Sequence, residues 1–494
     1  MDDLKARAVR GGFAKLCGQA ANFALRIGSL AILARLLDPE DFGLIAMATV
    51  VTGIYGLFST AGLSSATVQQ ATITNEQIST LFWINLGVGL LLALMTAASA
   101  PALVALYHQP RLFWVTIAIG FGFVLNGAGV QHSALLERQL RYVALTIIDL
   151  VSQIVGIGVA LWMAVAGFGY WALVAAAIVS PAMNTVCMWL ATAWIPSAPR
   201  WGRATFPMLR FGGTITLNGL IVYVAYNFDK VVIGRFWGAD ALGIYGRAYQ
   251  LVTIPTSNFN SAVGGVAFSA LSRLQHDPVR LRNYFLKGYS LVVSLTMPTT
   301  IFCAMFSKDI VLVVLGPKWI EAAIIFRLLA PTVLVFGMIN PLAWLLFSVG
   351  LTRRSLTIAC VIAPLVISAY LIGLPYGPKG VAIAYSTAMT LWVLPHIAWC
   401  LHGTAISLSD LFLAVRGPFL SGVVAALVAF GVQLEFGEWG PPYVRLMIEG
   451  GIMLGVYYSM LLLIMGQRAF YLDLLTALRK PRLPELPDRT ASVG

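Results

Sequence analysis

The stretch Ile32-Leu-Ala-Arg-Leu-Leu-Asp-Pro-Glu-Asp-Phe-Gly-Leu-Ile45 returns 200 residues later as Val232-Ile-Gly-Arg-Phe-Trp-Gly-Ala-Asp-Ala-Leu-Gly-Ile-Tyr245, with an arginine and a glycine at matching places. A second pair, Gly167-Phe-Gly-Tyr-Trp-Ala-Leu173 and Gly377-Pro-Lys-Gly-Val-Ala-Ile383, is separated by 210 residues. Two matches at nearly the same offset favour a duplicated unit, and chance similarity between short turn motifs is the alternative. A duplication of this length leaves the last part of the chain outside the repeat.

The composition around these stretches is strongly apolar. Hydrophobic residues make up 59% of the 494-residue chain and charged residues 11%, and the mean hydropathy is +0.84. Average soluble proteins carry about 25% charged residues, so this chain cannot cover its surface for contact with water. The composition therefore excludes a cytosolic enzyme, a nucleic-acid-binding domain and a disordered scaffold. The net charge of +12 is typical of basic cytoplasmic loops that face anionic lipid.

Apolar segments of about 20 residues predict membrane-spanning helices. We count fourteen, and within 285–349 we take 308–321 as one long loop between two spans. The basic residues 1–15 resemble the start of a signal peptide, but Arg26 and Arg35 interrupt the apolar run that follows, which predicts an uncleaved first span. The predicted spans are 17–37, 42–64, 80–106, 112–133, 143–166, 169–193, 211–234, 241–269, 285–307, 322–349, 355–375, 380–401, 412–433 and 444–466.

The predicted loops differ in charge between the two sides of the membrane. With the N-terminus in the cytoplasm, the arginine-containing loops near 138–141, 200–210, 273–287 and 353–354 all lie on the cytoplasmic side. The opposite loops carry acidic residues such as Asp38, Glu40 and Asp240. Because basic loops are retained in the cytoplasm, an even number of spans with both termini inside is predicted.

The predicted fold is an all-α integral membrane protein of about fourteen transmembrane helices. Two six-helix lobes, 1–205 and 206–405, are expected to be related by a pseudo-two-fold axis along the membrane normal. A helix pair at 406–466 is appended, and 467–494 is a basic, proline-containing cytoplasmic tail. Parallel repeats of this kind are typical of transporters, which bind their substrate between the repeats.

Polar side chains within spans are costly and usually line a polar cavity or meet a partner. Gln19, Asn22 and Arg26 share one helical face, and Arg247 and Gln250 share another. We predict that both faces line one cavity and that the two arginines bind an anionic group, because guanidinium groups bind phosphate in a bidentate manner. A structural ion pair, or an orientation towards the inner membrane surface, is the alternative for Arg26.

Three further polar residues belong to this prediction. Asn218 is expected to line the cavity on the span 211–234, on the face that also carries Asp229. Asp149 and Asp229 are the candidate sites for a coupling ion. The alternatives are a structural hydrogen bond at Asp149 and a place at the membrane interface for Asp229.

Sequence motifs for other chemistries are absent. The chain has no Gly-x-x-x-x-Gly-Lys-Ser/Thr, no His-Glu-x-x-His and no Gly-x-Ser-x-Gly, so neither nucleotide hydrolysis through a P-loop nor a familiar hydrolase site is predicted. The five cysteines are scattered and form no Cys/His cluster. We therefore predict no enzyme activity, no catalytic residue, no metal site and no cofactor, and transport must draw on ion gradients, the membrane potential or substrate supply.

Several stretches together carry a resemblance to a known family. They are Leu33-Ala-Arg-Leu-Leu-Asp-Pro-Glu-Asp-Phe-Gly-Leu44, Gln77-Ile-Ser-Thr-Leu-Phe-Trp-Ile-Asn-Leu-Gly87, Leu209-Arg-Phe-Gly212, Tyr245-Gly-Arg-Ala-Tyr249 and Phe268-Ser-Ala-Leu-Ser-Arg-Leu-Gln275. On these residues the chain resembles the Wzx-type polysaccharide repeat-unit flippases of the multidrug/oligosaccharidyl-lipid/polysaccharide exporter superfamily, in particular the colanic-acid and xanthan exporter branch. The similarity covers most of residues 1–400 and fades in the last pair of spans.

The resemblance implies an alternating-access flippase with a cationic central cavity in the bacterial cell inner membrane. The implied substrate is a short oligosaccharide on undecaprenyl pyrophosphate, exported for exopolysaccharide, lipopolysaccharide or O-antigen assembly. The implied partners are membrane lipids, a polysaccharide polymerase and a chain-length regulator, and nucleic acid is not among them. One alternative is a multidrug/cation antiporter of the same superfamily, which acidic residues in the lumen would favour. Another is a membrane glycosyltransferase or polymerase, which a large periplasmic loop with paired carboxylates would favour.

Overall fold

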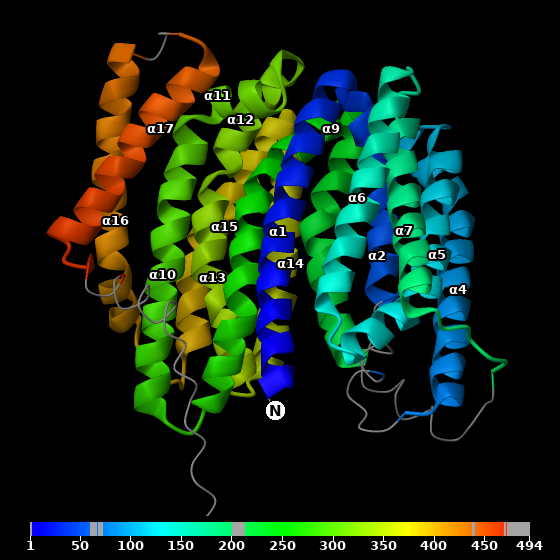
Figure 1. Cartoon of the computed structure of the whole chain (residues 1–494). Helices are drawn as coiled ribbons and strands as arrows, with labels where there is room; N and C mark the ends of the chain where they lie inside the picture. Colours follow the sequence, from blue (N-terminus) through cyan, green and yellow to red (C-terminus); the bar gives the residue numbers. More distant parts are fainter. Residues whose placement is uncertain are drawn as a thin grey trace, which may run out of the picture.

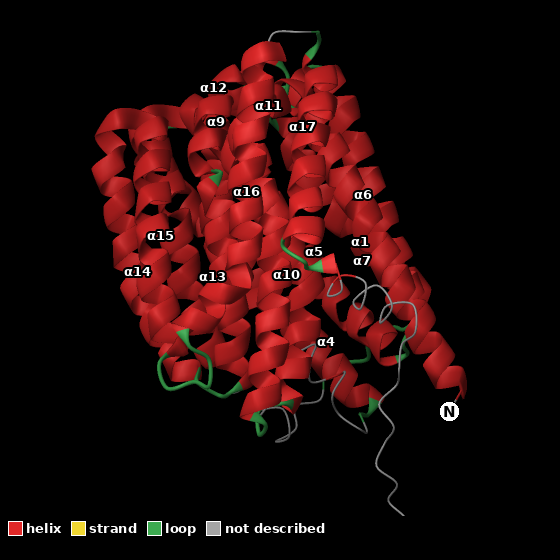
Figure 2. Ribbon diagram, turned by 90° about the vertical axis from the view of Figure 1, so that its left-hand side faces the viewer, coloured by secondary structure: helices red, strands yellow, loops and turns green. Residues whose placement is uncertain are grey.

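A computed structural model describes residues 2–59, 67, 73–199, 213–436, 440–468 and 471, with the backbone alone for 2–17, 213–218, 258–259, 261–263, 266 and 436. In this described part, every regular element is a helix, and most helices run roughly along one axis (Figures 1 and 2). The predicted all-α membrane fold is confirmed. The chain begins at one end of the bundle, here called the N-terminal end; the other is the opposite end (Figure 1).

The first six long helices correspond to the first six predicted spans, although residues 60–64 of the second predicted span lie outside the described residues. Local signals fix the ends of these helices. Thr74 and Gln77 form a reciprocal capping box at the start of the helix Asn75–Tyr107, and His108, in a left-handed conformation, caps its end. Gly167 and Gly169, with φ of +82° and +54°, lie in the turn between the helix that ends at Val165 and the helix that begins at Trp171. The helices are α1 (Asp2–Leu36), α2 (Pro39–Ser59), α4 (Asn75–Tyr107), α5 (Leu112–Arg138), α6 (Tyr142–Val165) and α7 (Trp171–Thr192).

The next two predicted spans, 211–234 and 241–269, are the two arms of one bent element, α9 (Gly213–Arg273). The bend is at Gly238, whose φ of +85° and ψ of −178° lie outside the helical region and favour glycine. This bend at the opposite end turns the chain back, so the two arms run in antiparallel directions.

The prediction of one long loop at 308–321, followed by a single span at 322–349, is wrong. After α10 (Pro278–Met305) the chain forms α11 (Ser307–Val314), the short 3₁₀ turn η2 (Pro317–Trp319), α12 (Ile320–Leu329) and α13 (Pro331–Ser348). The apolar residues Ile310 and Val311 are buried on α11, in a helix too short to show a clear period in the sequence. Pro331 has no backbone N–H and therefore interrupts the hydrogen-bond ladder between α12 and α13.

The remaining elements are α14 (Thr352–Gly373), η3 (Leu374–Tyr376), α15 (Gly377–Leu401), α16 (Leu408–Phe436) and α17 (Pro442–Ser459), which continues as the π-helical turn η4 (Met460–Ile464). Among the described residues, ten helical stretches are long and apolar enough to cross a membrane, and one of them, Thr352–Leu401, contains both α14 and α15. The chain is therefore a multi-pass membrane protein. The count of fourteen spans and the lobe boundaries stay predictions.

The two copies of the repeated motif contact each other reciprocally between α2 and α9. A Cβ atom added to Gly43 would lie 1.8 Å from the carbonyl oxygen of Ala239, and one added to Gly243 would lie 1.8 Å from that of Pro39. The contact partners, Pro39 and Ala239, are again 200 residues apart, so the two contacts are reciprocal. Both contacts are to backbone atoms, which cannot move aside as a flexible side chain can.

Alanine at either of these glycines is expected to destabilise the protein. Gly43→Ala or Gly243→Ala must separate α2 from α9, at a cost of about 1–3 kcal/mol, as for other overpacked sites. The measurement is thermal unfolding of the purified protein. Gly56→Ala on α2 and Gly246→Ala on α9 are matched controls, because a Cβ at either site meets nothing within 4 Å. Equal unfolding temperatures for the four variants would contradict the tight contact.

Candidate functional site

A cavity of about 930 Å³ lies between α1, α5, α6, α7 and the second arm of α9. Five of the sequence-predicted residues line it: Gln19, Asn22, Arg26, Asp149 and Gln250. The helical spacing of the first three places them on one face of α1, as their period predicts. The structure therefore brings the predicted α1 face, Asp149 and Gln250 together around one space.

Arg26 carries the positive charge of this cavity. Its side chain is exposed, and its guanidinium has no hydrogen-bond or ion-pair partner in the part of the chain that the structure describes, while its carbonyl oxygen accepts a hydrogen bond from Ser29 Oγ at 3.0 Å. The structure shows neither of the alternatives, an ion pair or an orientation away from the cavity. An exposed guanidinium in a polar cavity is suited to an anionic ligand.

Asp149 lies across the cavity on α6. Asn184 on α7 donates a hydrogen bond from Nδ2 to Asp149 Oδ1 over 3.0 Å. The alternative expected for Asp149, a structural hydrogen bond, is thus present, and this bond holds the carboxylate against α7.

The cavity also holds residues that the sequence analysis missed. Asn126, Gln153, Ser180 and Asn184 all line it, as does Ser152. With Gln19, Asn22 and Gln250, the wall carries six carboxamide side chains, each of which can donate and accept hydrogen bonds. The spacing of Asp149, Ser152 and Gln153 on one helical face could have identified the α6 residues.

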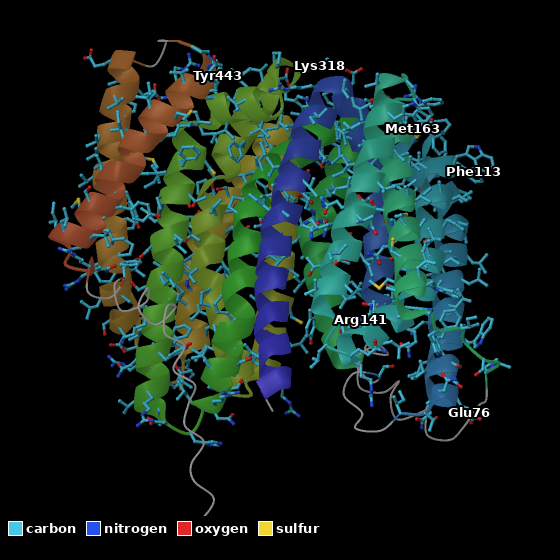
Figure 3. The ribbon with its side chains drawn as sticks, viewed as in Figure 1. Glu76, Phe113, Arg141, Met163, Lys318 and Tyr443 are labelled. Atoms are coloured by element: carbon cyan, nitrogen blue, oxygen red, sulfur yellow. The ribbon has the colours of Figure 1, made fainter. Side chains whose placement is uncertain are left out.

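A second cavity of about 230 Å³ continues from the first. It shares Gln19, Asn22 and Asp149 and is also lined by Glu137 and Tyr142, which lie where α5 ends and α6 begins. The turn between these helices is at the N-terminal end, where Figure 3 shows Arg141. The polar path therefore runs from the central cavity towards that end.

The opposite end is closed by contacts between the α1–α2 turn and the α11–α12 segment. Trp319 Nε1 donates to the carbonyl oxygen of Ala34 at 2.7 Å, and Arg35 donates to that of Val313 at 2.8 Å. Lys318, labelled in Figure 3, forms an ion pair with Asp38 at 2.8 Å. These contacts join the first two helices to the second half of the chain.

Arg247 does not lie among the residues that line the cavity, so its predicted place there is wrong for this structure. Its guanidinium carbon lies 4.5 Å from the ring centre of Phe42 on α2, and its Nε is buried without a hydrogen-bond partner among the described residues. Phe42 also contacts Trp319 edge to face, with ring centres 5.3 Å apart. Arg247 therefore belongs to the contact between α2 and α9 near the closed end.

Asp229 also lies away from the cavity. It is fully buried and accepts hydrogen bonds from Tyr245 Oη at 2.9 Å and from the backbone N–H of Lys230 at 2.8 Å. The alternative that Asp229 lies at the membrane interface does not fit this burial. The side chain of Asn218 lies outside the described residues, so its predicted role stays a prediction.

Comparison with known proteins gives one sequence family and several relatives. Residues 32–324 match the family described as polysaccharide biosynthesis protein. The chain is 27% identical over 399 residues to the teichuronic acid biosynthesis protein TuaB of Bacillus subtilis (strain 168), covering 76% of this chain and 78% of that protein. It is 26% identical over 471 residues to the succinoglycan biosynthesis transport protein ExoT of Rhizobium meliloti (strain 1021), covering 94% of each.

A solved structure shares the fold. The lipid II flippase MurJ in its inward closed conformation superposes with a TM-score of 0.70 at 14% sequence identity, covering 94% of this chain and 100% of that one. At this identity the likeness is one of fold. It extends over nearly all of the chain.

Proposed function

Since the chain belongs to the polysaccharide biosynthesis protein family, we propose that it is a flippase that moves an undecaprenyl-pyrophosphate-linked oligosaccharide across the bacterial inner membrane. The repeat unit would pass from the cytoplasmic to the periplasmic leaflet for exopolysaccharide or O-antigen assembly. The relative ExoT is named for transport in succinoglycan biosynthesis, and TuaB is named for teichuronic acid biosynthesis. The observation that carries the proposal is the cavity that combines one unpaired arginine with six carboxamides.

The chemistry of the cavity matches the two parts of such a substrate. A pyrophosphate is a dense anion, and the Arg26 guanidinium can bind two of its oxygens. Sugar hydroxyls both donate and accept hydrogen bonds, as do the carboxamides of Asn126, Gln153 and Asn184. A cation antiporter of the same fold would need uncompensated carboxylates in this space, whereas Asp149 already accepts a hydrogen bond from Asn184.

An alternating-access cycle accounts for the direction of transport. The polar path reaches towards the N-terminal end, and the contacts of Trp319, Arg35 and Lys318 close the opposite end. We infer that this conformation receives the substrate from the cytoplasm and that separation of the closed end releases it to the periplasm. A polysaccharide polymerase and a chain-length regulator would act on the released repeat unit.

Purified protein in liposomes tests the proposal. Lipid-linked oligosaccharide placed in one leaflet should become accessible to a membrane-impermeant glycosidase or lectin from the other side, much faster than in protein-free liposomes. A cell lacking the gene should accumulate the lipid-linked repeat unit and lose polymer. Equal accessibility with and without the protein would contradict the proposal.

The orientation gives a separate prediction. Reporters that are active only in the cytoplasm should give signal when fused after Arg282 or Arg354, and none when fused after Asp41 or Gly440, because arginine-containing loops are retained in the cytoplasm. The measurement is reporter activity normalised to the amount of fusion protein. Activity of the Gly440 fusion would show that the last helices run in the other direction.

A further inference from the structure

A charged contact between α11 and α17 lies outside the cavity, where the last two helices join the rest of the bundle (Figure 1). Asp309 on α11 is 6% exposed and forms an ion pair with Arg445 on α17, through Arg445 Nε at 3.4 Å and one terminal nitrogen. Arg445 also donates to the carbonyl oxygen of Gly440 at 3.2 Å. One arginine and one carboxylate by themselves make a neutral contact.

Glu449 adds a second carboxyl group to this contact. It is 2% exposed, and neither of its oxygens has a hydrogen-bond partner among the described residues. Among the described residues, Asp309 and Arg445 are the charged groups that act on it. The described part of the contact therefore contains two carboxyl groups and one guanidinium, and Asp309 is a partner of that guanidinium. A buried carboxylate without a partner is costly, and a cation or a proton removes that cost.

The described residues next to Glu449 on α17 pack closely against an apolar side chain. A Cβ on the neighbouring Gly450 would lie 2.6 Å from the ring of Phe302 on α10, so α17 packs closely against apolar groups here. Glu449 follows the start of α17 by seven residues, a rise of about 10 Å from the opposite end of the bundle. Glu449 therefore lies about two helical turns from that end.

We propose that Glu449, with Asp309 beside it, binds one small monovalent cation, a proton or a sodium ion, and that the bound cation holds α17 against α11. Arg445 and Glu449 are four residues apart on α17, a spacing at which arginine and glutamate can pair on one helix. When the cation leaves, the Glu449 carboxylate competes with Asp309 for Arg445. The occupancy of this site therefore sets how firmly the last two helices are joined to the rest of the bundle.

The test is thermal unfolding of the full-length protein in detergent, with two arms. In the sodium arm, replacing choline chloride by sodium chloride at fixed pH should raise the unfolding temperature by at least about 2 °C. In the proton arm, at fixed sodium, the unfolding temperature should fall as the pH is raised, because a buried carboxyl group without a hydrogen-bond partner among the described residues is less costly when it is neutral than when it is charged. A response in only one arm identifies the ion.

Glu449→Gln is the decisive variant, because glutamine is neutral and nearly isosteric. It should abolish the response of the wild type, while Glu321→Gln, at an exposed glutamate on the neighbouring α12, should retain it. Glu449→Asp keeps the charge on a shorter side chain and should move the response to higher cation concentration. The proposal is overturned if the wild type responds in neither arm, or if Glu449→Gln or Glu449→Asp responds as the wild type does.

Discussion

Replacing Arg26 by alanine is expected to reduce transport by about 10- to 100-fold. A charge-assisted hydrogen bond to phosphate contributes about 1.5–3 kcal/mol, and each 1.4 kcal/mol corresponds to about a factor of ten. Arg26→Lys should retain part of the activity, because the charge remains while the bidentate geometry is lost. The measurements are the rate of flipping in liposomes and the polymer yield in cells that lack the wild-type gene, each normalised to protein in the membrane.

Two further arginines serve as comparisons for Arg26. Arg353→Ala removes an exposed arginine at the N-terminal end of the bundle, on the first turn of α14, and should leave transport unchanged. Arg247→Ala should lower the unfolding temperature through the lost contact with Phe42 while leaving the affinity for the lipid-linked substrate unchanged. An Arg26→Ala protein that is inserted normally and transports at the wild-type rate would exclude Arg26 as the anion site.

Cross-linking the closed end is expected to stop transport completely. Cysteines at Asp38 and Lys318, whose side chains form an ion pair at 2.8 Å, can be joined by a short reducible bis-maleimide in a protein whose native cysteines are replaced by serine. The substrate cannot leave towards the opposite end while these segments are held together, and reduction of the linker should restore transport. Flipping is measured before and after reduction.

A matched pair within the first half of the chain is the control for the cross-link. Glu40 and Arg111 form an ion pair at 3.1 Å between α2 and α5 at the same end of the bundle. Cross-linking cysteines at these positions should leave transport unchanged, because both belong to the first six helices. Continued flipping with the Asp38–Lys318 linker in place would exclude alternating access through this end.

Periodicity explains which parts of the site could be predicted. Gln19, Asn22 and Arg26 repeat along α1 with a helical period, and all three line the cavity. Asn126 lines it too, but it is an isolated polar residue on a long apolar helix and produces no period. Gln250 lines the cavity as predicted and Arg247 does not, because the Arg247 guanidinium contacts Phe42 on another helix. A contact between distant helices cannot be predicted from the local sequence.

The same limit applies to the fold. Long apolar helices such as α4 and α6 follow directly from length and hydropathy. The short helices α11 and α12 could not be predicted, since eight and ten residues are too few to show a period or to suggest a span. The repeated motif did indicate a duplication, and the reciprocal contact of Gly43 and Gly243 is consistent with it.

That glycine contact also supplies a point about which the second arm of α9 can tilt. It lies near the bend of α9, and the second arm runs from Gly243 to Arg273, a length of about 45 Å. A tilt of about 5° around the contact would shift the distant end of this arm by about 4 Å, while atoms beside the glycines would hardly move. Small changes in helix tilt would thus admit oligosaccharides of different width at the N-terminal end. The contacts of Trp319, Arg35 and Lys318 at the opposite end would stay in place.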